Sequence, residues 1–227
     1  KSAVRLNMPE VPEEIFMDGL KTLIDLDRQW VPKTEGTSLY IRPTMYATEE
    51  AITARTSNEF TFVILLAYSP SYYTKRLSVK IADYFSRSAP GGVGFAKCAG
   101  NYAGSFYPTE QARLEGYDQI IWTDSISHKF IEEAGTMNVF VRIGNKLLTA
   151  PTSERILDGV TRDSVLQLAK DNGYDIEVRP VSVEEMYEAY QKGELREVFG
   201  VGTAVVVNVY DAVGFGEERC QLPDFTD

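Results

Sequence analysis

Lys97 is the residue whose surroundings best suit covalent chemistry. It is the only charged residue between Arg87 and Glu110, in a stretch of glycines and of small or apolar residues. Loss of hydration disfavours the ammonium form of a lysine, and a neutral amine can form a Schiff base with an aldehyde. The alternative is a solvated loop lysine whose stem lies on the surface, and composition alone favours that interpretation.

Three further segments could assist such a lysine. Glu132 and Glu133 are adjacent near the end of a predicted strand, so one carboxylate can face inward and would then need a cationic partner. Residues 156–163 form a turn that opens a helix, whose first N–H groups can bind phosphate. Residues 200–204 contain two glycines and a threonine that could wrap an anion. The alternatives are a solvated strand end, ordinary helix capping and a plain strand-to-helix turn.

Composition and charge limit the possible partners. The 227 residues are 44% hydrophobic and 25% charged, which is typical of a globular protein. A net charge of -10 argues against nucleic acid as a partner. Cys98 and Cys220 form no CxxC pair, and His128 is the only histidine, so no metal site is expected. No apolar run reaches the roughly 18 residues of a membrane span, and we expect a cytoplasmic protein.

The first third of the chain predicts one helix and two strands. The helix begins at Pro12 and ends before Pro32. Residues 38–42 alternate as in a strand that ends at Pro43, and residues 60–68 form an apolar run typical of a strand buried on both faces. We therefore expect a partial small N-terminal domain over residues 1–68, an interdomain loop over 69–78 and a large cofactor-binding domain over 79–227.

The large domain is expected to mix strands and helices. The predicted strands are 79–84, 119–123, 129–133, 138–143, 146–149, 176–179 and 197–200. The predicted helices are 103–115, 161–173 and a segment that opens with a capping box at Ser182 and closes at Gly193. The strands are too clustered for a pure βαβ winding, which indicates a mixed α/β (α+β) fold.

Lys97, an inward carboxylate, the phenol of Tyr102 and two phosphate-binding turns are together the groups that pyridoxal 5′-phosphate requires. The sequence resembles the branched-chain amino acid aminotransferases, which belong to the fold-type IV class of pyridoxal-phosphate enzymes. The resemblance covers essentially the whole chain in the family's order and spacing, and its motifs are 36–43 (GTSLYIRP), 92–102 (GVGFAKCAGNY), 133–138 (EAGTMN), 156–163 (ILDGVTRD) and 199–204 (FGVGTA).

The resemblance implies a role for each matching residue. Lys97 would carry the cofactor, Glu133 would pair with its pyridine nitrogen, and Tyr102 would hydrogen-bond its phenolic oxygen. The remaining implied cofactor contacts are Arg87 near the cofactor, Leu157 behind the ring, and Val160, Thr161 and Thr203 at the phosphate. The implied substrate contacts are Tyr40, Arg42, Tyr72, Thr136 and Ala204. The implied architecture has two domains with the cofactor between them.

The implied activity is transfer of the amino group of leucine, isoleucine or valine to 2-oxoglutarate by a homodimer. The alternatives are another fold-type IV enzyme, such as a D-amino acid transaminase or an aminodeoxychorismate lyase, and an inactive truncated fragment that acts only as an interaction module. Two positions depart from the family pattern: Asp158 stands where proline is usual, and Ala99 where glycine is frequent. Family members also have a larger N-terminal part, with another phosphate-binding arginine, and further C-terminal residues.

Overall fold

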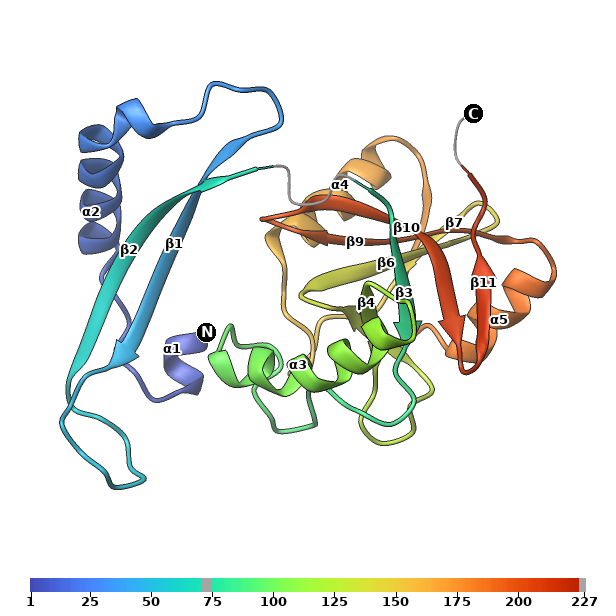
Figure 1. The fold of residues 1–227 in the computed structure, drawn as a ribbon, viewed down its shortest axis with the longest axis horizontal. Helices are drawn as coiled ribbons and strands as arrows, with labels where there is room; N and C mark the ends of the chain where they lie inside the picture. The colour runs from blue at the N-terminus through green and yellow to red at the C-terminus, as the bar shows by residue number, and fades with distance from the viewer. Residues whose placement is uncertain (71–74, 225–227) are drawn as a thin grey trace. The chain divides into compact units, whose positions relative to one another are not determined.

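The computed structural model describes residues 1–70 and 75–224, which fall into two compact units, residues 1–74 and 75–227 (Figure 1). Strand β2 (Phe60–Ser69) ends at the first residue of the predicted interdomain loop, 69–78, and strand β3 (Leu77–Ile81) begins at residue 77 of that loop. The domain bounds stay a prediction. Each unit has its own secondary structure and is considered separately.

The first unit consists of helices beside a two-stranded antiparallel ribbon. Its elements are α1 (Ser2–Arg5), α2 (Glu13–Leu26), a 3₁₀ turn (Arg28–Trp30), β1 (Ser38–Ala47) and β2. Two acidic residues in the first turn of α2 complement the positive end of that helix, as predicted. The helix packs on the ribbon through the rings of Phe16 and Phe62, whose centroids are 5.7 Å apart.

Two expectations for this ribbon are wrong. Strand β1 continues through Pro43, because among the described residues β1 pairs only with β2, and a proline is tolerated on a strand with an open edge. The apolar run of β2 is not buried on both faces: its side chains are half-buried or exposed within the described unit. A ribbon covered mainly by one helix does not provide two buried faces.

The second unit is built on one nine-stranded sheet. After β3 come β4 (Gln119–Thr123), β5 (Ile131–Ala134), β6 (Met137–Ile143), β7 (Lys146–Thr149), β8 (Asp175–Val178), β9 (Leu195–Gly202), β10 (Val206–Phe215) and β11 (Glu218–Gln221). The hydrogen-bonded order is β11-β10-β3-β4-β5-β6-β7-β8, and β9 pairs with both β6 and β10. Strands β10, β3, β4, β5, β6 and β9 therefore form a closed circuit. The mixture of parallel and antiparallel pairs confirms the predicted α/β (α+β) class.

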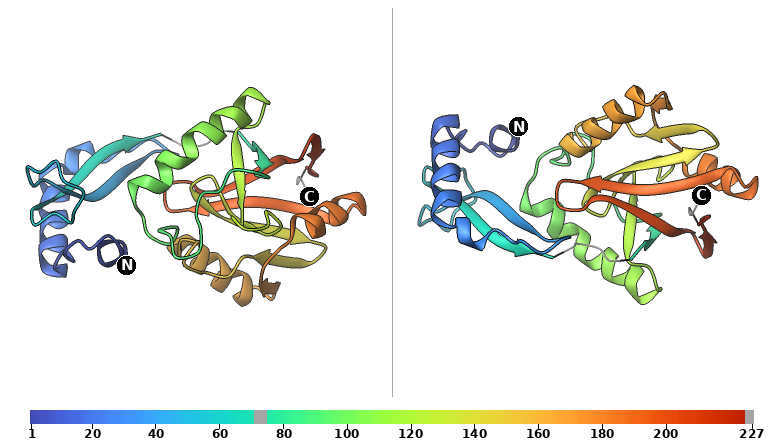
Figure 2. Two further views of the ribbon diagram at one scale, coloured as in Figure 1. Left: turned by 90° about the horizontal axis from the view of Figure 1, so that it is seen from below. Right: turned by 90° about the horizontal axis from the view of Figure 1, so that it is seen from above.

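Three helices lie against this sheet, as Figures 1 and 2 show: α3 (Ala99–Leu114), α4 (Val160–Asp171) and α5 (Val183–Gln191). The predicted cap of α5 is confirmed, since Ser182 Oγ accepts the N–H of Glu185 at 2.9 Å. The predicted stop of α3 is also confirmed, because Gly116 has φ +89°. Helix α3 begins four residues before the predicted 103, so Tyr102 lies in its first turn rather than in a loop.

The core of the second unit contains fully buried aromatic side chains. Phe140 on β6 and Phe199 on β9 stack with ring centroids 5.3 Å apart and planes at 6°. Trp122 on β4 is 0% exposed, and its indole N–H donates to the carbonyl of Gly135. Strands β10 and β11 have no counterpart among the predicted strands, although β10 carries core residues such as Tyr210. None of the described helices has the length and apolar character needed to cross a membrane.

Replacing Phe140 by alanine tests the importance of this stack. Phe140→Ala leaves a cavity beside Phe199, and we expect the free energy of unfolding to fall by about 3–5 kcal/mol. Urea denaturation measures the change. Phe106→Ala, at a position 70% exposed on α3, is the matched control and should change stability by less than about 0.5 kcal/mol. Equal losses in the two variants would contradict the assignment of the core.

Candidate active site

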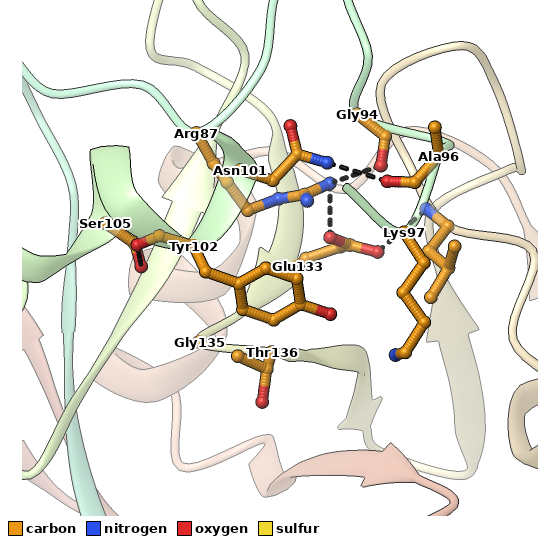
Figure 3. A pocket seen from close by; sticks show the side chains of 11 residues that line it. Arg87, Gly94, Ala96, Lys97, Asn101, Tyr102, Ser105, Glu133, Gly135 and Thr136 are labelled. Carbon is orange, nitrogen blue, oxygen red and sulfur yellow. Dashed lines mark hydrogen bonds and ion pairs between the residues drawn. The ribbon is translucent and has the colours of Figure 1, made fainter. Parts of the chain in front are cut away.

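A small hollow in the second unit brings together residues from distant segments of the chain (Figure 3). Lys97 comes from the loop before α3, Tyr102 from the first turn of α3, and Glu133 from β5. The predicted site residues among those that line it are Arg87, Lys97, Tyr102, Glu133, Thr136 and Leu157. An amine, a phenol and a carboxylate thus share one cavity.

Glu133 is 3% exposed and is held on three sides. Its Oε2 pairs with Nη2 of Arg87. Its Oε1 accepts the N–H of Leu157 at 2.8 Å and lies 3.3 Å from Nδ2 of Asn138. Asn138 Nδ2 also donates to the carbonyl of Leu157 at 2.8 Å, so this amide ties β6 to the segment that precedes α4. The carboxylate position is therefore fixed by one ion pair and two neutral donors.

Both adjacent glutamates are buried, which corrects the expectation that only one faces inward. Glu132 is 4% exposed, and its Oε1 lies 2.6 Å from Nε of Arg155. The expectation assumed one solvent-facing side of the strand, whereas every residue of β5 is buried. Each carboxylate pairs with an arginine of its own, as buried charges require.

Burial changes the proton affinity of both carboxyl groups. It raises the pKa of Glu133 to about 7, although the charge of Arg87 and the N–H of Leu157 favour the ionised form. Burial likewise raises the pKa of Glu132, and the charge of Arg155 opposes that shift. Glu133 can therefore gain or lose a proton near neutral pH.

Lys97 does not have the desolvated environment that its sequence neighbours suggested. The side chain of Lys97 is exposed and lines the hollow. Its neighbours Ala96 and Cys98 are buried in the unit and do not cover the amine. The loop is held by Asn101, whose Nδ2 donates to the carbonyls of Val93 at 2.9 Å and Ala96 at 2.8 Å. Figure 3 shows the Lys97 amine and the Tyr102 hydroxyl on the same side of the Glu133 carboxylate.

The predicted phosphate contacts are not among the residues that line the hollow. Val160 and Thr161 are the first residues of α4, which begins soon after Leu157 and has no side-chain cap at Gly159. Thr203 and Ala204 are exposed in the turn between β9 and β10. This turn joins two antiparallel strands, so the alternative of a strand-to-helix turn is wrong.

The predicted substrate contacts are scattered. Thr136 is exposed at the hollow. Tyr40 and Arg42 lie on β1 in the first unit, where Nη2 of Arg42 donates to the Tyr40 hydroxyl at 3.0 Å. Tyr72 lies outside the described residues. The assignment of these side chains to a substrate pocket stays a prediction.

Comparison with known proteins identifies the family. The amino-transferase class IV family matches residues 1–208. The chain belongs to the class IV aminotransferases. Among its relatives, a probable branched-chain-amino-acid aminotransferase of Staphylococcus epidermidis is 48% identical over 91% of this chain and 59% of its own length. Branched-chain-amino-acid transaminase 1 of Bacillus subtilis is 43% identical over the same shares. The chain thus spans about three fifths of these relatives.

Two solved class IV structures have the same fold. One is the branched-chain amino acid aminotransferase of Escherichia coli. The other is a branched-chain amino acid aminotransferase complexed with N-(5′-phosphopyridoxyl)-L-glutamate. Each matches with a TM-score of 0.75 and 26% identity, over 96% of this chain and 70% of the other. These matches confirm the predicted fold-type IV architecture of the described units.

Several residues of this class IV site have no counterpart among the predicted site residues. Asn138 and Asn101 hold the carboxylate and the lysine loop through their side-chain amides. Arg155 and Ser88 surround Glu132. Asn101 and Asn138 stand inside the motifs that carry the resemblance, which was an available signal, whereas nothing in the sequence links Arg155 to a residue on a distant strand.

The side chains present fit pyridoxal 5′-phosphate by the chemistry of their donors. An exposed amine can react with an aldehyde, a phenol can donate to an oxyanion, and a buried carboxylate can hold a protonated ring nitrogen. The described residues contain no group of three or more His, Cys, Asp or Glu side chains that could hold a metal ion. The uncapped start of α4 offers backbone N–H groups suited to a phosphate.

The raised pKa of Glu133 predicts a pH-dependent stability. Between pH about 4.5, where an unfolded glutamate titrates, and pH about 7, the folded chain keeps a proton that the unfolded chain has lost. This contribution to stability is complete below the unfolded pKa and is lost as the pH rises through the folded pKa. Relative to Glu133→Gln, the unsubstituted chain should lose about 3 kcal/mol across that window.

Urea denaturation of both proteins at a series of pH values measures this difference. Subtracting the variant cancels the contributions of titrating groups that do not interact with Glu133, so the remaining slope belongs to Glu133 and to its coupling with Glu132. A difference that stays constant over the whole range would contradict the burial of an ionisable Glu133.

Proposed function

We propose that this protein is a pyridoxal-phosphate-dependent transaminase that transfers the amino group of leucine, isoleucine or valine to 2-oxoglutarate. The convergence of Lys97, Tyr102 and Glu133 on one hollow carries the proposal. The names of the bacterial relatives support the branched-chain substrates. The phosphopyridoxyl adduct named for one of the solved aminotransferases supports the cofactor.

The chemistry divides between the cofactor and the chain. Bound pyridoxal 5′-phosphate supplies an aldehyde for amines and an electron sink for the charge left when the substrate Cα loses its proton. Lys97 would hold the cofactor through its amine, and the same amine, once free, would take the Cα proton of the substrate. Glu133 would keep the ring nitrogen protonated, and Tyr102 would donate to the phenolic oxygen.

The remaining assignments follow from the resemblance. Arg87 lies beside Glu133. The resemblance would place Leu157 behind the ring and would assign the phosphate to Val160, Thr161 and Thr203. It would assign substrate contacts to Tyr40, Arg42, Tyr72, Thr136 and Ala204. An apolar substrate pocket discriminates weakly by the number of methylene groups, so leucine, isoleucine and valine should all react.

The competing functions make different use of the same fold. A D-amino acid transaminase or an aminodeoxychorismate lyase would use the same lysine, but the relatives' names give them no support. An inactive truncated fragment would fold without turning over substrate. Cofactor absorbance and amino-acid turnover separate these possibilities.

We also propose that the protein is a cytoplasmic homodimer. The two cysteines are free and buried, which suits a reducing compartment. The dimer follows from the resemblance to a family whose active sites lie near a dimer interface, and light scattering of the purified protein tests it.

Removal of the Lys97 amine should abolish turnover. Lys97→Ala keeps the fold because the side chain is exposed, and formation of 2-oxo acid from leucine should fall by about 1,000-fold or more. The matched control is Lys192→Ala, an exposed lysine that ends α5 and should leave turnover unchanged. Turnover of Lys97→Ala at the rate of the control would refute the proposed function.

A further inference from the structure

The Glu132–Arg155 pair has no part in the chemistry proposed above, although Glu132 is as deeply buried as Glu133. Oε1 of Glu132 and Nε of Arg155 are 2.6 Å apart, and neither atom has a hydrogen-bond partner among the described residues. Neither residue lines the hollow. Glu132 is buried and the Arg155 side chain is 29% exposed, so the contact joins a charge inside the sheet to the loop that contains Arg155. A buried ion pair is weak evidence for stability, and we therefore ask what this one holds in place.

The backbone of Arg155 is the point at which the parts of the site meet. Its carbonyl accepts from Nη2 of Arg87 at 2.6 Å and from Oγ of Ser88 at 3.0 Å. The same carbonyl lies 2.4 Å from where a Cβ of Gly94 would stand, so the loop that leads to Lys97 packs directly on it. One peptide group therefore orients Arg87 and supports the lysine loop.

The connection continues to Glu133 two residues further along. The N–H of Leu157 donates to Oε1 of Glu133 at 2.8 Å, and Leu157 lines the hollow. Segment 155–157 thus touches both glutamates, through the side chain of Arg155 and the backbone of Leu157. The side chain of Arg155 is anchored to β5 by Glu132, which holds the carbonyl to which Arg87 donates close to that strand.

We propose that the Glu132–Arg155 ion pair is the positioning element of this active site: it fixes segment 155–157, which orients Arg87 and Glu133 toward the cofactor. The inference rests on the proposed function, since a cofactor is what the orientation serves. Glu132 and Arg155 act through other residues and do not touch the reacting atoms.

Hydrogen exchange of the Leu157 amide, measured by NMR before cofactor is added, tests whether the Glu132–Arg155 pair holds segment 155–157 in place. Glu132→Gln and Arg155→Met should each raise the exchange rate about tenfold or more, because segment 155–157 then opens more easily. The matched control is Glu197→Gln, which breaks the Glu197–Arg142 pair between β9 and β6, away from the hollow. An exchange rate within about twofold of the unsubstituted chain in Glu132→Gln would overturn the proposal.

A single variant that leaves a buried charge unpaired can fail to fold. The double variant Glu132→Leu/Arg155→Met removes both charges together, which folded proteins often tolerate. The proposal predicts that this folded double variant also exchanges the Leu157 amide about tenfold faster. Exchange at the unsubstituted rate would show that the pair holds nothing and would overturn the proposal.

Titration with pyridoxal 5′-phosphate, followed by absorbance, tests whether the Glu132–Arg155 pair affects cofactor binding. The Kd should rise about tenfold in Glu132→Gln and in the double variant, and stay unchanged in Glu197→Gln. Unchanged affinity despite faster exchange would overturn the positioning role.

If the unsubstituted chain does not bind the cofactor, the proposed function fails, and the role of the pair in cofactor positioning fails with it. The exchange rates would still show whether the pair holds segment 155–157.

Discussion

Two consecutive carboxylates in the interior of the sheet set the conditions for everything around the hollow. Glu132 and Glu133 lie on β5, which is hydrogen-bonded to β4 and β6, and both side chains are almost fully buried. A buried carboxylate needs a cation and hydrogen-bond donors. Arg87 and Arg155 come from loops far apart in the sequence. Both lie at β5, where Arg87 supplies the cation for Glu133 and Arg155 supplies the cation for Glu132. The pocket forms where those loops converge.

The two chemically active groups have opposite exposure, and this contrast suits the proposed reaction. Lys97 faces the hollow, where it can exchange with a substrate amine, whereas Glu133 is kept from water behind it. An electrostatic contact is stronger where water is excluded, so a buried carboxylate can hold a proton on a ring nitrogen. The packing that excludes water also raises the pKa of Glu133, and a ring cation beside it would favour the ionised form again.

Local signals in the sequence predicted local structure well. The Ser182 cap, the glycine after α3 and the strands β4 and β7 depend on residues close together in the chain, and all are present. Contacts over long distances were not predictable in the same way. Every residue of β5 is buried, so the argument that alternate residues face water failed at Glu132. The partner of Glu132 lies on a loop that no periodicity connects to β5.

Borohydride reduction of the chain with pyridoxal 5′-phosphate, followed by peptide mapping, tests the central claim most directly. If the hollow is built around a cofactor-binding lysine, the pyridoxyl label will be found on Lys97 alone, among all the lysines of the chain. Labelling spread over exposed lysines such as Lys129 and Lys192, with none preferred, would contradict the account.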